Sequence, residues 1–376
     1  MDDLTSNKEH PMSGISTFSL PATAAPKLEA MVDQIIARPG RMIDLKAMEQ
    51  VPEQLDVKAV INSLPEGIAE EDFVKMLRLA MLTECGTDSY AAVFQEGADK
   101  YKANWLTRFN QQVWVPDEYT HTLPYYMMLR SIGFTEEELD YQIKDLQERV
   151  YNHCCGISPV ELTTFGTVQE YLTDNWHGLL ATLMKPAAPE AAHFANLVKR
   201  RETMHTVWYR DMTAVMVEEN PELIELVAKT LSTFQMPGTQ LVPDCGPLAL
   251  TWMQKLNVDF NQVAKDLVRN FSESAGNVKR SGMLLVEMAV AREYPIGPFP
   301  ARFVRGAMNR LGGAGYGILG EAVLEKVGLP TPAKWIGKPD SGIRFHTGIY
   351  EAIRSRMRTF IVNKIDIRSV TGDTAA

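Results

Sequence analysis

The 376-residue chain has few cysteines, and none of its apolar runs is long. The spacing of its four cysteines matches no zinc or redox motif, and the adjacent Cys154 and Cys155 are poorly placed to bridge each other. No apolar stretch approaches the roughly 20 residues that cross a bilayer, so we expect no membrane partner. The N-terminal segment is acidic and lacks a basic stretch followed by an apolar one, which argues against a signal peptide. These features predict a cytoplasmic protein in a reducing compartment.

Basic residues are also few: the chain has 38 Lys and Arg against 47 Asp and Glu, which gives a net charge of −9. This balance argues against general nucleic-acid binding. The charge is unevenly spread: residues 276–376 hold 15 basic and 8 acidic residues, whereas the other 275 residues hold 23 and 39. The basic C-terminal segment is either a solvated face or a docking surface for an acidic partner.

Strand signals are nearly absent, since the sequence has no Asn-Gly hairpin turn and no sustained alternation of apolar and polar residues. Helical patterns dominate instead, and Thr135 with Glu138 predicts a capped helix start. We therefore predict an all-α protein with three parts. Residues 1–26 read as a flexible tail, residues 27–275 as a helical domain, and residues 276–376 as a helical extension punctuated by Gly and Pro.

Two Glu-x-x-His motifs are the strongest chemical signal in the chain. They are Glu118 with His121 and Glu202 with His205. Residues three apart share one face of a helix, so each motif presents a carboxylate and an imidazole together. In carboxylate-bridged dinuclear metal sites, each such helix has a partner helix that carries one further inward glutamate.

Candidate partners exist upstream of both motifs. Glu84 precedes Glu118 by 34 residues, and Glu170 precedes Glu202 by 32, which suits two antiparallel helices and a connection. Four glutamates and two histidines make six ligands, and their oxygen and nitrogen atoms suit iron or manganese. The spacing alone leaves open that these residues belong to surface salt bridges instead.

The sequence around these residues resembles the acyl-carrier-protein desaturases, which are di-iron enzymes on a ferritin-like bundle. The similarity spans about residues 70–270. Its motifs are the following: Leu82-Thr-Glu84, the Trp-rich Trp105 to Trp114 approach to Glu118, Phe165-Gly-Thr-Val-Gln-Glu170-Tyr-Leu-Thr173, and Met236-Pro237.

The resemblance implies a role for each residue at a matching position. Glu84 and Glu170 would be terminal ligands, Glu118 and Glu202 would bridge two irons, and His121 and His205 would each bind one. Thr173 would relay a proton beside the oxygen site, although a threonine in a helix also commonly bonds its own backbone. Trp114 would lie near the metals, where plain core packing is the alternative.

The sequence departs from the family at the two Glu-x-x-His motifs. Arg201 stands where the family has an acidic residue associated with electron delivery. Pro116 and Pro124 flank the first motif, where the family's helix continues, and proline kinks or restarts a helix.

The resemblance implies an O₂-dependent desaturase that introduces a double bond into an acyl chain on acyl carrier protein. It would belong to lipid biosynthesis, take electrons from a donor such as ferredoxin, and form a homodimer. The departures favour an alternative, a di-iron hydroxylase or N-oxygenase of specialised metabolism. Two hypotheses remain: a ferritin-like iron-binding protein and a non-catalytic helical protein.

Overall fold

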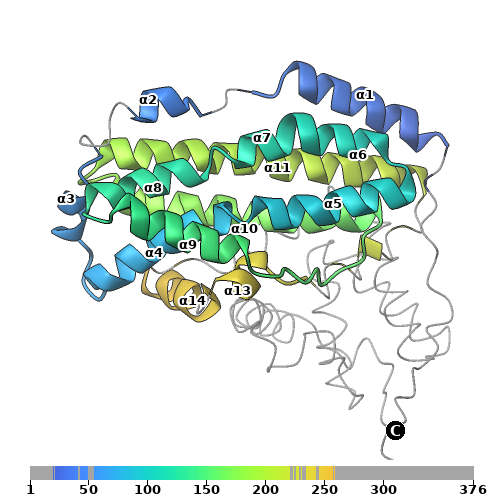
Figure 1. Ribbon diagram of the computed structural model, residues 1–376. Coiled ribbons are helices and arrows are strands. Elements are labelled where there is room, and N and C mark those ends of the chain that lie inside the picture. Colours follow the sequence, from blue (N-terminus) through green and yellow to red (C-terminus); the bar gives the residue numbers. More distant parts are fainter. Residues whose placement is uncertain are drawn as a thin grey trace, which may run out of the picture.

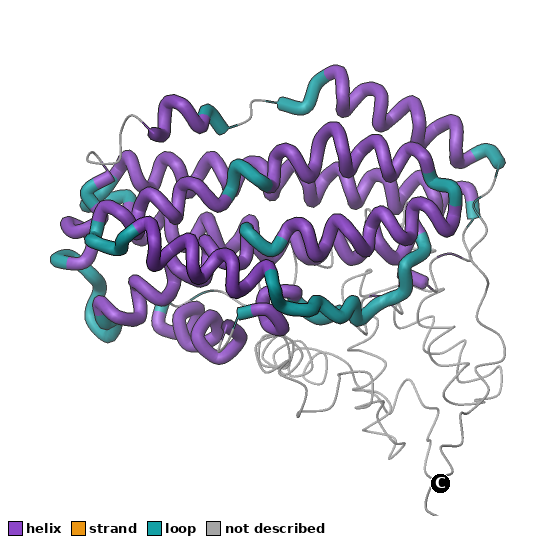
Figure 2. The backbone as a smooth tube through the Cα atoms, viewed as in Figure 1, coloured by secondary structure: helices purple, strands orange, loops and turns teal. Residues whose placement is uncertain are grey.

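The computed structural model describes residues 22–40, 43–49, 55–220, 234–242 and 245–256, together with residues 20, 223, 226, 227, 230 and 258. This part of the chain is helical and contains no strand (Figures 1 and 2), which confirms the predicted all-α class. None of its helices is both long and apolar enough to cross a membrane. The predicted boundary near residue 275 and the extension 276–376 lie outside the described residues.

Four helical segments lie side by side and form a bundle (Figure 1). The first comprises α4 (Glu70–Glu84) and α5 (Thr87–Tyr101), and the second comprises α6 (Asn104–Phe109), the π-helix η2 (Asn110–Trp114), α7 (Val115–Glu118) and α8 (Thr122–Ser131). The third and fourth are single helices, α10 (Pro159–Met184) and α11 (Pro189–Glu219). Helix α4 packs on α8, α5 packs on α6, and α10 packs along α11.

Helix α10 is the central element of the bundle, and every residue from 158 to 173 is buried. A helix that is buried on all sides in this way must satisfy its polar side chains internally. Its threonines do so by donating their hydroxyls to carbonyls one turn earlier, as Thr167 does to Thr163 at 2.8 Å. The helix begins with Ser158 at its N-cap, Pro159 in its first turn and the carboxylate of Glu161 returning to the cap.

The first two segments are interrupted, whereas α10 and α11 are continuous. The first breaks between Glu84 and Thr87, and the second breaks over residues 119–121. Pro124 lies in the first turn of α8, where a missing N–H costs no helical hydrogen bond, whereas Pro116 lies where η2 continues without a break into α7. The expected restart of the helix around the first Glu-x-x-His motif is therefore confirmed.

Shorter helices cover the bundle. They are α1 (Ala24–Ala37), α2 (Leu45–Glu49), α3 (Val57–Ile61), α9 (Glu136–Gln147), α13 (Pro237–Leu241) and α14 (Cys245–Lys255). Helix α1 packs on α6 and α11 and begins at Ala24, two residues before the expected end of the tail at residue 26. This earlier start is possible because Pro26 lies in the first turn. Thr135 and Glu138 form the predicted capping box at the start of α9.

Candidate metal centre

The six predicted ligands form one buried cluster inside the bundle. They are Glu84, Glu118, His121, Glu170, Glu202 and His205. The continuous helices α10 and α11 supply their ligands from mid-helix, where Glu202 and His205 lie one turn apart. The interrupted segments supply theirs at the interruptions, since Glu84 ends α4 and Glu118 ends α7. The breaks in these segments thus coincide with the site.

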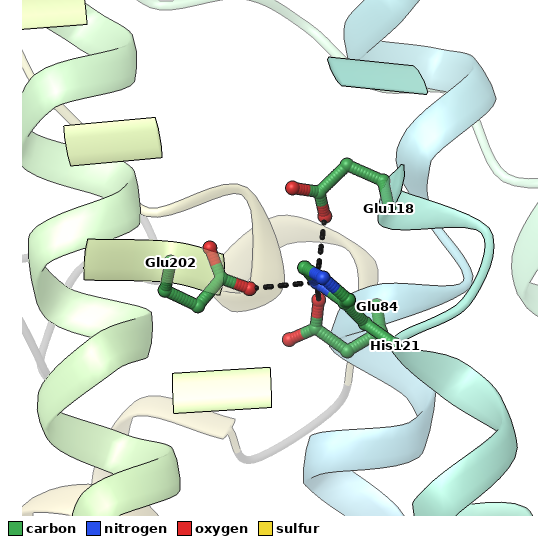
Figure 3. A group of neighbouring side chains, drawn as sticks. All are labelled: Glu84, Glu118, His121 and Glu202. Carbon is green, nitrogen blue, oxygen red and sulfur yellow. Dashed lines mark ion pairs between the residues drawn. The ribbon is translucent and has the colours of Figure 1, made fainter. Parts of the chain in front are cut away.

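The ligand atoms divide into two overlapping groups, and within each group they lie within 4.8 Å of one another. The first group combines Glu84 and His121 with Glu118 and Glu202, and Figure 3 shows how these four side chains converge. The second group combines Glu170 and His205 with the same two glutamates. Glu118 and Glu202 are therefore shared by both groups, which is the arrangement expected of bridging carboxylates.

His121 stands at the centre of the first group. Its Nδ1 lies 2.9 Å from Glu202 Oε1, 3.4 Å from Glu118 Oε2 and 3.6 Å from Glu84 Oε2. Despite the short distances, Nδ1 has no hydrogen-bond partner, and neither has either carboxylate oxygen of Glu202. The atoms converge on a common space and are not aimed at each other.

His205 occupies the equivalent place in the second group. Its Nδ1 lies 2.8 Å from Glu118 Oε1 and 3.6 Å from both Glu170 Oε2 and Glu202 Oε2. Nδ1 of His205 and Oε1 of Glu118 also lack a hydrogen-bond partner. The two imidazole rings are stacked with centroids 5.7 Å apart.

The electrostatics of the cluster fit a cationic occupant. Burial, together with Glu118 and Glu202, raises the pKa of Glu170 well above its usual range. Burial alone would lower the pKa of His121, but the carboxylates of Glu118 and Glu202 outweigh it and raise the pKa well above the ordinary value. Four buried glutamates, two of which (Glu118 and Glu202) have oxygens without a hydrogen-bond partner, require either protons or cations. Two divalent ions would neutralise all four and take up those oxygens, so the residues fit a dinuclear metal site.

Trp114 and Thr173 both lie beside Glu170. Trp114, the last residue of η2, is buried and donates its Nε1–H to Glu170 Oε1 at 3.2 Å, so it does more than fill the core. Thr173 lies one turn after Glu170, but its hydroxyl donates to the helix carbonyls of Gln169 at 3.2 Å and Glu170 at 3.0 Å. In this structure it takes the helix-bonded alternative.

A buried histidine and tyrosine support Glu84, and the sequence alone gave them no definite role. His177 Nε2 lies 3.0 Å from Glu84 Oε1, and Tyr125 hydrogen-bonds His177 Nδ1 at 2.5 Å. His177 follows Glu170 by seven residues, two helical turns, so it lies on the same face of α10 as that ligand. This periodicity was the available signal for His177, whereas Tyr125 had none.

A buried charge pair lies behind His205, and only one of its members was noted in the sequence. Asp117 Oδ2 lies 2.9 Å from His205 Nε2 and accepts a hydrogen bond from Nε of Arg201 at 2.5 Å. Asp117 directly precedes Glu118, as Arg201 directly precedes Glu202. These opposite charges in matching positions of the two motifs were the overlooked signal.

Cys154 and Cys155 are not joined by a disulfide bond, and their sulfur atoms lie 3.4 Å apart.

Comparison of the whole sequence with protein-family models finds no match, and comparison with curated proteins finds none. No family is assigned to the chain on this basis.

Proposed function

We propose that the chain is an O₂-dependent di-iron oxidase that introduces a double bond into an acyl chain carried by acyl carrier protein. The observation that supports this most is the sharing of Glu118 and Glu202 between two ligand groups. Each group also has one carboxylate and one imidazole of its own, and such a set is typical of paired iron sites in helical bundles. The similarity of the surrounding motifs to the desaturases supports the choice of substrate.

The terminal carboxylates are held in a way that leaves one oxygen for a metal. Glu84 turns Oε1 to His177, and Glu170 turns Oε1 to Trp114. In both residues it is Oε2 that faces the histidine of the ligand group, at 3.6 Å. Hydrogen bonds of this kind orient ligands and lower the entropy lost on metal binding.

When bound, the iron pair would supply oxidising power: with O₂, two external electrons and two protons, two hydrogens leave adjacent carbons, giving an alkene and two waters. The chain contributes a buried site that excludes water, because the ligand side chains are all almost fully buried. Thr173 is the candidate for moving a proton near Glu170. We expect an external donor such as ferredoxin and a homodimeric assembly.

A di-iron oxygenase that inserts oxygen into its substrate is the second candidate. Two observations favour it: Arg201 is buried beside the site, and the second helical segment is interrupted over residues 119–121. Arg201 and the interruption change the surroundings of the six candidate ligands. They leave the ligands themselves the same for both candidate functions.

Metal content of anaerobically loaded protein tests the site. We expect about two irons per chain in the parent protein and clearly fewer in Glu118→Gln and Glu202→Gln. Glutamine keeps the volume of the side chain but offers no carboxylate to bridge two metal ions. Glu136→Gln is the control, since Glu136 lies exposed on α9. Iron content that is equal in all four proteins would reject the site.

Product analysis under isotopically labelled O₂ then separates the two candidates. A desaturase should convert a long acyl chain on acyl carrier protein to an alkene that contains no label. Label retained in the product, from an acyl chain or from small amine or aromatic substrates, would show an oxygenase instead.

A further inference from the structure

The two histidines of the candidate centre differ in what lies behind them. His205 points Nδ1 into the site and has Asp117 Oδ2 2.9 Å from its Nε2. His121 also points Nδ1 into the site, but its Nε2 has no hydrogen-bond partner. Oδ1 of the same Asp117 lies 3.9 Å from it, beyond hydrogen-bond distance.

Asp117 is itself fixed by Arg201, which is held on several sides. The guanidinium of Arg201 lies over the Trp208 ring, 5.6 Å from its centroid, and its Nη1 contacts the sulfur of Met204 at 3.2 Å. Gly40 leaves the room that this group needs, because a Cβ there would lie 2.6 Å from Nη1. Arg201 also cancels the charge of Asp117, so the pair adds no net charge to the four glutamates.

Glu84 and Glu170, the glutamates that each belong to one ligand group, do not differ in the way the two histidines do. Glu84 accepts a hydrogen bond from His177 at 3.0 Å, and Glu170 accepts one from Trp114 at 3.2 Å. Each half of the centre therefore has one buried donor on its own glutamate. The halves differ at the imidazoles.

We propose that the two metal positions are unequal, and that the position formed by Glu170 and His205 binds its metal more tightly. Asp117 accepts the Nε2–H of His205, which fixes the tautomer whose bare Nδ1 faces the site and prevents the ring from turning. His121 has no such acceptor and must be ordered when its metal binds. This inference rests on the proposed function only in requiring that the chain binds two metal ions.

Titration with Co²⁺ followed by calorimetry and visible absorption tests the inequality without turnover. The parent protein should bind two ions in separate steps, and outer-sphere partners typically change affinity 10–100-fold. Glu84→Ala, which weakens the other position, should keep the tighter step. Glu170→Ala should keep the weaker step.

Asp117→Leu tests whether Asp117 causes the inequality, because leucine has a similar shape and accepts no hydrogen bond. Combined with Glu84→Ala, it should loosen the retained step 10–100-fold, and combined with Glu170→Ala it should change affinity less than about threefold. Leucine leaves Arg201 buried without its partner, which can prevent folding. The double variant Asp117→Leu/Arg201→Gln removes both charges and is expected to show the same selective loss. Asp140→Asn, at an exposed aspartate of α9, should alter neither step.

The outcomes separate this inference from the proposed function. If the parent protein binds two ions and Asp117→Leu weakens both positions equally, Asp117 serves both histidines and the inference is wrong while the dinuclear site stands. Two identical steps in the parent protein also overturn it. If the parent protein binds no Co²⁺, the metal site and the inference fail together.

Discussion

The candidate centre is a group of buried acids with too few bases to balance them. Among the described residues, Arg201 is the arginine that lies beside the cluster. Its positive charge is paired with the carboxylate of Asp117 and does not neutralise the glutamates. The histidines compensate for the remaining carboxylates only by holding protons, and burial opposes this. In the metal-free protein the cluster must therefore retain protons, which metal binding would release.

Thr173 gives a test at the level of one hydroxyl group. If it moves a proton to the oxygen site, Thr173→Val should lower product formation by about 10²–10⁴-fold while iron content stays unchanged, because valine keeps the shape and Glu170 is untouched. Thr164→Val is the matched control, since Thr164 is buried on the same helix and donates to Val160 in the same way. Turnover that is equal in the two variants would make Thr173 only a helix residue.

The sequence predicted which six residues form the buried cluster. The two Glu-x-x-His motifs need only helical periodicity, whereas Glu84 and Glu170 were chosen from the length of a helix pair together with the family resemblance of the surrounding motifs. Asp117 and Tyr125 escaped prediction for a different reason. Their partners, His205 and His177, lie 88 and 52 residues away along the chain. Such contacts depend on how α7 faces α11 and how α8 faces α10. For Asp117 the one hint was the opposite charge of Arg201 at the matching position of the other motif, and for Tyr125 there was none.

At the level of helices, the site joins two rigid elements to two interrupted ones. Helices α10 and α11 carry Glu170, Glu202 and His205 in continuous backbone, where each position is fixed by its neighbours. Glu84, Glu118 and His121 lie at helix ends, where local opening costs less free energy. Rearrangement on metal or substrate binding is therefore expected at α4 and α7. Pro124 predicted the interruption of the second segment, and the end of α4 at Glu84 was also expected, since Gly86 follows and glycine commonly ends helices.

The packing of α10 on α11 depends on Gly166. A Cβ at this position would lie 2.6 Å from the Tyr209 ring, which is buried and hemmed in by Phe94, Phe109 and Trp114. We expect Gly166→Ala to lower the free energy of unfolding by about 1–3 kcal/mol, as overpacked cores typically do. Urea unfolding measures this.

Gly178 on the same helix is the control for that experiment. A Cβ there meets only the flexible end of Lys199, at 2.8 Å. Gly178→Ala should therefore be neutral or stabilise by up to about 1 kcal/mol through helix propensity. Equal destabilisation by both substitutions would mean that contact with Tyr209 is not the cause.

The capping box of α9 predicts a pH dependence of stability. Hydrogen bonds from the backbone and hydroxyl of Thr135 lower the pKa of Glu138 below its ordinary value. A carboxyl whose pKa is lower in the folded state stabilises the fold above its unfolded pKa, and this contribution is lost as pH falls through the folded pKa. Glu138→Ala should thus lower the urea midpoint at neutral pH, and the difference from the parent protein should shrink below about pH 4. Glu137→Ala, in the same first turn but outside the capping box, is the control.

Over the whole chain, charge is segregated between the acidic first 275 residues and the basic last 101. The candidate centre belongs to the acidic part and is buried within it. An acidic carrier protein would be repelled by most of that part and attracted by residues 276–376, which lie outside the described residues. The sequence is therefore the whole basis for placing the carrier at the C-terminal segment.

Arg354 and Arg358 are the residues with which to test that placement. They lie four apart in the short run Arg354-Ser-Arg-Met-Arg358, so on a helix they would share one face. Association with acyl carrier protein should weaken as salt is added, because exposed charges are screened beyond roughly 8–10 Å near physiological ionic strength. Reversing both arginines to glutamate should weaken binding by about tenfold or more, since each reversal replaces an attraction of up to about 1 kcal/mol by a repulsion. Reversing Lys100 and Lys144, which are exposed on α5 and α9, makes the same change in net charge and should have a smaller effect. If the two double variants bind the carrier equally well, net charge and not this surface governs the association.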